Sequence, residues 1–269
     1  MEKLDRLGWA AGLTFVAHGV RVGIRTTDPG VLDRAASCLP FGAKPSQKEC
    51  VDLLYSINVG RQRGNVKYFH MLYANDLRMV RTLYLESIFS ALRHELEACV
   101  LERARRRVFL HAGVVGWQGQ AIVVPGKTWA GKTTLIVALV RAGATYYSDE
   151  YAALDLQGRV HPHPRPLSIR KENGETSETP IETLGGRTGR GPLPVGTVLM
   201  THYRPGRVWR PRQLSIGRAA LQLMHYTYSA RLAPERTMAV LLQVAERART
   251  LTGVRGEAHE LVNTLLDNG

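Results

Sequence analysis

The sequence predicts an α/β (α+β) fold, with a small N-terminal α+β module followed by a larger domain built around a strand, a loop and a helix. The chain has 269 residues, of which 44% are apolar, and this is enough to bury a substantial core. Its centre passes from two apolar strands into a glycine-bracketed loop and an apolar helix. The N-terminal part alternates strand and helix patterns. We therefore expect domains over 1–105 and 106–269.

Composition excludes several classes of protein. No stretch approaches the ~20 apolar residues that a membrane helix requires, and the N-terminus lacks the basic-then-apolar order of a signal peptide. We therefore expect a cytoplasmic protein with no membrane partner. Cys38, Cys50 and Cys99 are odd in number and lack metal-site spacing, so we expect no disulfide framework and no zinc site, with all three side chains buried.

The charge balance leaves a nucleic-acid partner open. There are 36 Lys and Arg against 23 Asp and Glu, which gives a net charge of +13. Clustered cations attract phosphates, but the only dense basic run lies at 103–107 and has no interleaved aromatic residues. Only 7 of these 36 basic residues are lysines, and such an excess of arginine more often reflects the base composition of the genome than nucleic-acid binding. We therefore do not expect nucleic acid to be the main partner.

The N-terminal module is expected to contain one hairpin, two further strands and two helices. His18-Gly19 is flanked by alternating apolar residues, as in a hairpin turn, and Asp28-Pro29-Gly30 is typical of a helix start. In chain order the expected elements are a hairpin over 13–27, a helix over 29–38, strands over 51–58 and 66–73, and a long amphipathic helix from 85 to the arginine run at 103–107.

The second domain is expected to begin with two apolar strands joined by a turn at 116–119. The helix after the central loop should stop at Gly143. The segment 171–194 has no apolar periodicity, so we expect a long mobile loop there. The remaining expected elements are strands over 108–115, 121–125, 144–147, 151–155, 159–163 and 195–202, a turn over 204–207, and helices near 216–227, 234–250 and 257–267.

The central loop fits the phosphate-loop pattern G-x-x-x-x-G-K-[ST] at every fixed position. In this pattern the backbone N–H groups and the helix start face an anion, the lysine reaches the outer phosphates, and the hydroxyl binds magnesium. The sequence therefore predicts ATP and Mg²⁺ as ligands. The residues expected to contact them are Gly126, Lys127, Thr128, Trp129, Ala130, Gly131, Lys132, Thr133 and Thr134.

Two carboxylates and a histidine are expected beside this loop. Asp149 and Glu150 follow the helix after one short return strand, and His111 lies at the head of the hairpin that precedes the loop. A carboxylate near a γ-phosphate can accept a hydroxyl proton or hold magnesium, and a histidine can orient it. We therefore expect His111, Lys132, Asp149 and Glu150 to be catalytic, and Thr133, Asp149 and Glu150 to bind the metal. Which carboxylate is the base stays open.

These motifs resemble the catalytic domain of the HPr kinase/phosphorylase family. The likeness rests on His111-Ala112-Gly113, the phosphate loop, Arg141-Ala142-Gly143 and Ser148-Asp149-Glu150, which follow one another in the family's order. It implies a P-loop kinase fold similar to phosphoenolpyruvate carboxykinase and transfer of phosphate from Mg·ATP to a protein serine. It also implies Lys132 and Thr133 at the phosphates and metal, Glu150 at the position of the base, and His111 in support.

A later family signature, Leu-Glu-x-Arg, corresponds here to Leu167-Ser168-Ile169-Arg170, with serine in place of a metal-binding glutamate. Glu172 or Glu175 could supply that ligand. Divergent relatives encoded with lasso-peptide biosynthetic clusters phosphorylate the precursor peptide, and the segment 161–170 is similar to theirs. Arg165 and Arg170 could bind phosphate or a substrate carboxylate, or lie on a surface loop. Ser168 could face the substrate or be an ordinary strand residue.

The sequence therefore predicts an ATP- and Mg-dependent kinase that acts on a serine or threonine hydroxyl of a peptide or protein. A nucleotide-binding regulator that hydrolyses ATP slowly is the first alternative, and a basic nucleic-acid-binding module is the second. Phosphate on an added acceptor distinguishes the kinase from the regulator, whereas steep salt dependence of duplex binding is typical of the third class. Homo-oligomer formation stays open.

Overall fold

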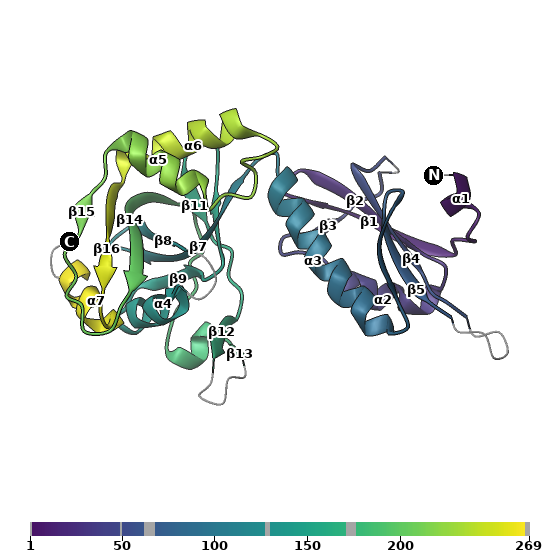
Figure 1. Ribbon diagram of the computed structural model, residues 1–269, viewed down its shortest axis with the longest axis horizontal. Coiled ribbons are helices and arrows are strands. Elements are labelled where there is room, and N and C mark those ends of the chain that lie inside the picture. Colours follow the sequence, from purple (N-terminus) through teal and green to yellow (C-terminus); the bar gives the residue numbers. More distant parts are fainter. Residues whose placement is uncertain (1, 49, 62–67, 127–129, 171–175, 267–269) are drawn as a thin grey trace. The chain divides into compact units, whose positions relative to one another are not determined.

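The computed structural model describes residues 2–48, 50–61, 68–126, 130–170 and 176–266 (Figure 1). The chain is a mixed α/β protein of the α+β class. It divides into two compact units, Met1–Arg106 and Arg107–Gly269, so the division falls one residue after the boundary expected from the sequence. Among the described residues, no helix is long and apolar enough to cross a membrane.

Unit 1 is a six-stranded sheet whose one face is covered by the long helix α3, with the short helix α2 beside it (Figure 1). The strand order is β3-β1-β2-β4-β5-β6, with only β2 and β4 parallel. The elements are α1 (Glu2–Asp5), β1 (Ala11–Ala17), β2 (Val20–Thr26), η1 (Pro29–Val31), α2 (Leu32–Ala36), β3 (Lys44–Pro45), β4 (Leu53–Asn58), β5 (His70–Ala74), β6 (Leu77–Thr82) and α3 (Leu85–Arg103).

Local sequence signals account for much of unit 1. His18 and Gly19 both adopt positive φ and close the β1–β2 hairpin, as expected. The Asp28 side chain accepts a hydrogen bond from the Gly30 N–H and caps the first helical turn. The expectation for the cysteines was partly wrong, because Cys50 is exposed whereas Cys38 and Cys99 are buried. Strand β6 was not expected, since its side chains are mostly exposed and give no apolar period.

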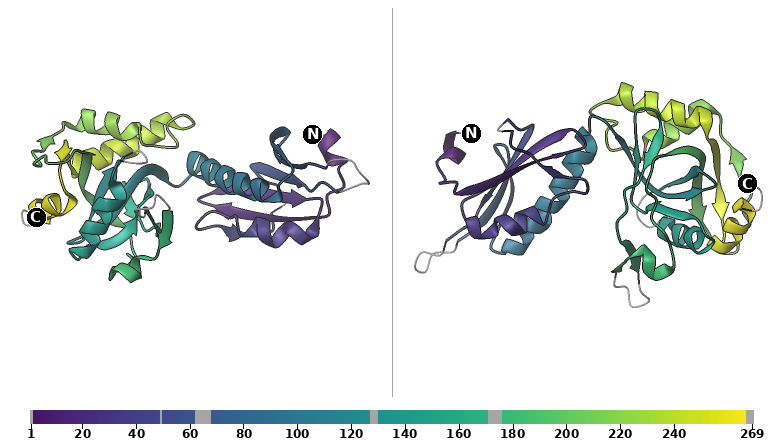
Figure 2. Two further views of the ribbon diagram at one scale, coloured as in Figure 1. Left: turned by 60° about the horizontal axis from the view of Figure 1, so that its bottom comes forward. Right: turned by 180° about the vertical axis from the view of Figure 1, so that it is seen from behind.

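Unit 2 is an eight-stranded sheet with helices on both faces, α5 and α6 on one and α4 and α7 on the other (Figure 2). Its strand order is β11-β10-β7-β8-β14-β16-β15, with β9 paired to β7. The strands are β7 (Val108–Trp117), β8 (Gln120–Pro125), β9 (Thr145–Ser148), β10 (Tyr151–Leu154), β11 (Arg159–His161), β14 (Leu193–Tyr203), β15 (Arg212–Gln213) and β16 (Arg249–Arg255). The helices are α4 (Lys132–Arg141), α5 (Ile216–Met224), α6 (Pro234–Arg247) and α7 (Ala258–Leu266).

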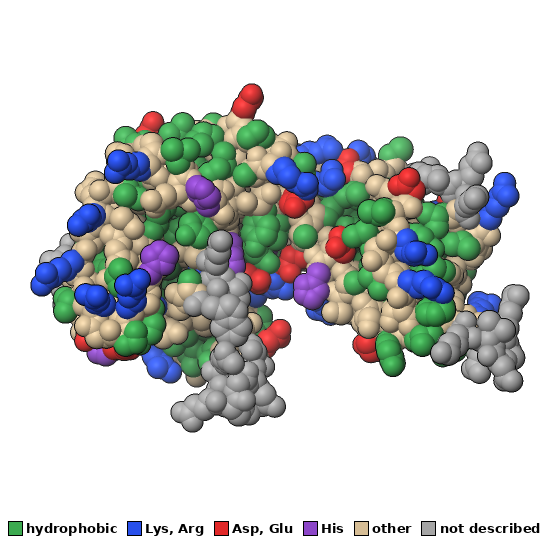
Figure 3. Space-filling model, in the orientation of Figure 1, with side chains coloured by type: hydrophobic (Ala, Val, Ile, Leu, Met, Phe, Trp, Pro, Cys, Tyr) green, Lys and Arg blue, Asp and Glu red, His purple; other side chains and the backbone are tan. Residues whose placement is uncertain are grey.

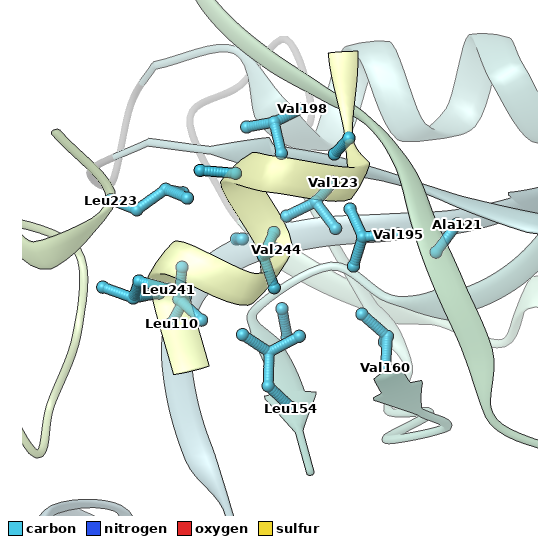
Figure 4. Packing of buried hydrophobic residues seen from close by; sticks show 14 of the residues in the cluster. Leu110, Ala121, Val123, Leu154, Val160, Val195, Val198, Leu223, Leu241 and Val244 are labelled. Atoms are coloured by element: carbon cyan, nitrogen blue, oxygen red, sulfur yellow. The ribbon is translucent and has the colours of Figure 1, made fainter. Parts of the chain in front are cut away.

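Side chains along the strands of unit 2 point alternately to the two faces of the sheet, and each face has its own hydrophobic core. On β8, Val123 packs toward α5 and α6, whereas its neighbours Ile122 and Val124 pack toward α4 and α7. Figure 4 shows the first core, where α6 lays Leu241 and Val244 over side chains from several strands. Both faces of the sheet are therefore buried, which fixes the register of the strands that carry the candidate site.

Three expectations for unit 2 were wrong in detail. The segment 171–194 is not one long loop, because β13 (Thr176–Thr179) pairs with β12 (Leu167–Arg170) and a 3₁₀ helix follows at Ile181–Leu184. Residues 171–175 lie outside the described residues. The helix expected over 234–250 ends at Arg247, and β16 follows it. The turn expected over 116–119 is confined to Gln118-Gly119, since Gly116 belongs to β7.

These errors have a physical origin. Strand β13 pairs with β12 through its backbone and carries only polar residues, so it gives no apolar period. Strand β16 is held in the sheet by parallel pairing with β14, a contact between segments far apart in the sequence. Local pattern did not reveal either element, because tertiary contacts decide both.

Candidate functional site

The candidate site lies where three parallel strands end. Strands β8, β14 and β16 run parallel, so their carboxyl ends meet at one edge of the sheet, which is a common place for ligands in α/β sheets. The expected phosphate loop leaves β8 at this edge, and α4 begins directly after it. Gly131 adopts φ +74° at the start of α4, a conformation that favours glycine. The expected ligand residues Lys127, Thr128 and Trp129 lie outside the described residues.

Lys132 joins the loop to the preceding hairpin. Its side chain is only 8% exposed, and Nζ donates to the Gly126 carbonyl oxygen at 2.8 Å. The Nζ atom also lies 3.4 Å from Nε2 of His111, on β7. Burial lowers the pKa of Lys132, although Asp149 and Glu150 oppose this effect. Burial and the Lys132 charge together lower the pKa of His111, so its imidazole is neutral at pH 7 and can accept a hydrogen bond.

Asp149 lies beside the first turn of α4, as the sequence predicted. It occupies the bend between β9 and β10, where its Oδ2 accepts a hydrogen bond from Thr133 Oγ1 at 2.7 Å. Its other carboxylate oxygen, Oδ1, is buried and has no hydrogen-bond partner. Burial raises the pKa of this carboxyl to about 6, against the lowering effects of Thr133 and Lys132. The site thus holds a desolvated carboxylate with unused acceptor capacity.

Gly113 leaves the space that Asp149 and α4 occupy. A Cβ at this position would lie 2.6 Å from Ile136 Cγ1 and 3.6 Å from Asp149 Oδ1. Because side chains alternate along a strand, His111 and Gly113 face the site whereas Ala112 between them is buried in the opposite core. The His-Ala-Gly sequence therefore has a steric reason in this fold.

The side chain of Glu150 contacts different residues from that of Asp149. Its Oε1 accepts a hydrogen bond from the Tyr151 hydroxyl at 3.0 Å, and its Oε2 forms an ion pair with Arg165 at 3.1 Å. The Ser148 hydroxyl accepts hydrogen bonds from the N–H groups of Glu150 and Tyr151 and so fixes the bend. Asp149 is consequently half-buried beside the helix start, while Glu150 is exposed beside an arginine.

The other predicted residues are placed less centrally. Thr134 is exposed on the first turn of α4. Ser168 is an exposed residue of β12 opposite Glu178, as the strand interpretation expected, and it takes no part in the hydrogen bonds that link Lys132, Thr133, Asp149 and Glu150. The side chain of Arg170 and the segment with Glu172 and Glu175 lie outside the described residues.

Arg255 is a site residue that sequence reasoning missed. It ends β16 and is only 2% exposed, and its guanidinium donates to the carbonyl oxygens of Gly131 at 2.9 Å and Gly256 at 3.0 Å. The group lies over the ring of Tyr203, and its Nε has no hydrogen-bond partner. Burial lowers the pKa of Arg255. No local signal marks it, because the sequence pattern predicted a helix up to residue 250 and another from 257, with no strand between them.

The side chains at the helix start suit a hard divalent cation. The described residues contain no group of three or more His, Cys, Asp and Glu side chains that could hold a metal by themselves. Magnesium is usually held by one or two carboxylates together with phosphate oxygens and water, so a full protein cage is not required. Thr133 Oγ1 and the unpartnered Oδ1 of Asp149 are hard oxygen donors of the right type.

No protein-family model matches this sequence, and a search of the curated proteins finds no match either.

Proposed function

We propose that the protein is a Mg·ATP-dependent kinase that phosphorylates a serine or threonine hydroxyl of a peptide or protein. The observation that carries this proposal is the hydrogen bond from Thr133 to Asp149 beside the buried Lys132, because it joins a complete phosphate-loop motif to a carboxylate from a separate strand. Such a pair at a strand–loop–helix edge is suited to phosphate and metal.

The proposed nucleotide side consists of Lys132, Thr133 and Asp149. Lys132 can exchange its hydrogen bond with the Gly126 carbonyl for the outer phosphate oxygens, which offer it full negative charge. Thr133 and Asp149 hold magnesium through their oxygen atoms, and the metal when bound neutralises charge on the phosphates. Burial raises the pKa of Asp149, and a bound cation would favour its ionised form.

Glu150 is the proposed general base, in line with the resemblance to HPr kinase/phosphorylase. Its exposed carboxylate is open to an incoming hydroxyl, and Arg165 and Tyr151 orient it. During transfer the hydroxyl oxygen forms a bond to the γ-phosphorus, the bond from that phosphorus to the β–γ bridging oxygen breaks, and the hydroxyl proton passes to Glu150. ADP and a phosphorylated side chain are the products.

The proposed fold is the HPr-kinase-like P-loop kinase fold. It is supported by the order of elements from β7 to β10, in which the hairpin with His111, the loop, α4, the short strand β9 and the acidic bend follow one another without insertion. In this order His111 comes from the hairpin before the loop and Asp149 from the bend after α4, and both act on Lys132.

An array of serine- and threonine-containing peptides with γ-labelled Mg·ATP tests this function. The wild-type protein should label a subset of the peptides, and Lys132→Ala should label none because the ammonium at the outer phosphates is removed. Lys48→Ala, which removes an exposed lysine in unit 1, is the matched control and should label the same subset. Labelling by Lys132→Ala at the wild-type rate would overturn the assignment, and inorganic phosphate without labelled peptide would favour a regulatory ATPase.

A further inference from the structure

A cavity of about 210 Å³ opens at the same sheet edge as the phosphate loop, on the face that α5 covers. Its walls come from the carboxyl ends of β14 and β16 and from the end of α5. Among its lining residues are Met200, His202, Gln222, His225, Tyr226 and Thr252. Apart from Met200 these side chains are polar and none is acidic, so the cavity suits a polar or anionic group.

The cavity wall is tied to the proposed catalytic residues through the backbone. The carbonyl oxygen of Tyr226 accepts a hydrogen bond from the N–H of His111 at 2.7 Å. The next residue, Thr227, forms a β-bridge with Leu110. One backbone hydrogen bond therefore links the cavity wall to the strand that carries His111, the histidine that contacts Lys132.

The surroundings of the cavity are strongly basic. Residues 183–234, which form β14, β15 and α5, include eight arginines and no aspartate or glutamate. In Figure 3, Lys and Arg side chains are gathered over β15, β16 and α5, with histidine side chains beside them. The net charge of +13 is thus unevenly distributed, and this part of unit 2 carries a large share of it.

Two of these arginines are neighbours of residues that line the cavity. Arg212 of β15 lies directly opposite Thr252 in the antiparallel pair with β16, so both side chains are on the same face of the sheet. Arg218 lies one turn before Gln222 on α5 and two turns before His225, on the same side of the helix. Both arginines are exposed, and the structure shows neither in an ion pair among the described residues.

We infer that this cavity and its two arginines form a docking site for an acidic segment of the acceptor polypeptide. The inference rests on the proposed kinase function. A cavity of this volume admits a single side chain, and arginine forks bind a carboxylate through two parallel hydrogen bonds. Nucleic acid is the less suitable occupant, because its extended backbone is usually bound by a groove with aromatic stacking platforms. Docking here holds the acceptor at the sheet edge from which the phosphate loop leaves β8.

Fluorescence anisotropy with a short labelled peptide of alternating glutamate and serine tests the inference at low ionic strength without nucleotide. The double variant Arg212→Glu/Arg218→Glu should weaken binding about tenfold or more, because attraction becomes repulsion. His225→Asp, at an exposed lining position, should weaken it as well. Each single variant, Arg212→Glu or Arg218→Glu, should also weaken binding. Arg190→Glu is the matched control for these single variants, since it makes the same charge change in the same acid-free stretch but before the opposite end of β14, and it should bind as the wild type does.

Equal weakening by Arg190→Glu would mean that only net charge matters and would overturn the site. Tighter binding of an oligothymidylate than of the peptide, with the same dependence on Arg212 and Arg218, would overturn the choice of a polypeptide. Lys132→Ala separates this inference from the proposed function, because it should abolish phosphate transfer yet bind the acidic peptide normally. Transfer that persists in a docking variant at saturating acceptor leaves the kinase assignment intact.

Discussion

Replacing Asp149 by asparagine should abolish phosphate transfer. It should also remove the loss of folding stability that ionisation of this buried carboxyl causes as the pH rises. The pKa of this carboxyl is raised from 3.8 to about 6 in the folded state, chiefly by burial. Between these values the folded protein binds more protons than the unfolded chain, so stability falls as the pH rises from about 4 to about 6. The difference between the two pKa values corresponds to about 3 kcal/mol at pH 7.

Asparagine cannot ionise, so the variant lacks this pH dependence. Its amide keeps an acceptor for Thr133, but burial of an amide group without a partner at the Oδ1 position costs about 1 kcal/mol at every pH. The stability of Asp149→Asn relative to the wild type should therefore rise by about 3 kcal/mol between pH 4 and pH 7, to a net gain of about 2 kcal/mol at pH 7. Urea unfolding of both proteins across this pH range measures it.

Asp155→Asn is the matched control, because the pKa of Asp155 is shifted in the opposite direction from that of Asp149. Burial alone would raise the pKa of Asp155, but hydrogen bonds from His161 and Arg159 outweigh it and hold the pKa below its usual value. This carboxylate therefore stabilises the protein above the pKa of the unfolded chain, and the contribution is lost as the pH falls. Asp155→Asn should cost about 1–3 kcal/mol at pH 7 and less at low pH. A lower stability of Asp149→Asn at pH 7 than at pH 4, relative to wild type, would refute the reasoning for Asp149.

Two further substitutions test how the loop is held. Gly113→Ala should cost about 1–3 kcal/mol of unfolding free energy, because its Cβ would collide with Ile136. The added cost should largely disappear in an Ile136→Ala background, and a double-mutant cycle in urea with no coupling would contradict the steric account. Arg255→Met should weaken Mg·ATP binding about tenfold in calorimetric titration, because the charge-assisted hydrogen bond to Gly131 is lost. Unchanged affinity would show that Arg255 has no part in positioning the loop.

The elements around the loop could be predicted because their signals are local. Hydrophobic runs marked β7 and β8, the glycine pattern marked the loop, and the short return to an acidic pair placed Asp149 next to Thr133. Each of these signals depends only on residues that are close together in the sequence. The approach of His111 to Lys132 was also predictable, since a hairpin brings the head of its first strand to the end of its second.

The rest of the site depends on contacts between distant segments. Strand β16 and the buried Arg255 at its end are fixed by parallel pairing with β14, which no local pattern encodes. The cavity beside α5 likewise combines β14, β16 and α5. His225 also lines this cavity, and no motif in the sequence marks it. The ion pair between Glu150 and Arg165 also joins residues whose contact no sequence spacing implies.

The most direct test of the central claim follows the γ-phosphate of Mg·ATP in a single reaction, with phosphorylated acceptor and free inorganic phosphate quantified in the same quenched samples. A peptide labelled on the array serves as acceptor, and Glu150→Gln and Lys132→Ala serve as comparison variants. The account predicts that phosphoserine or phosphothreonine accumulates with the wild-type protein, falls by ~10²–10⁴ in Glu150→Gln, and is absent in Lys132→Ala. Release of inorganic phosphate by the wild type with no phosphorylated acceptor, or transfer that is unchanged in both variants, would contradict it.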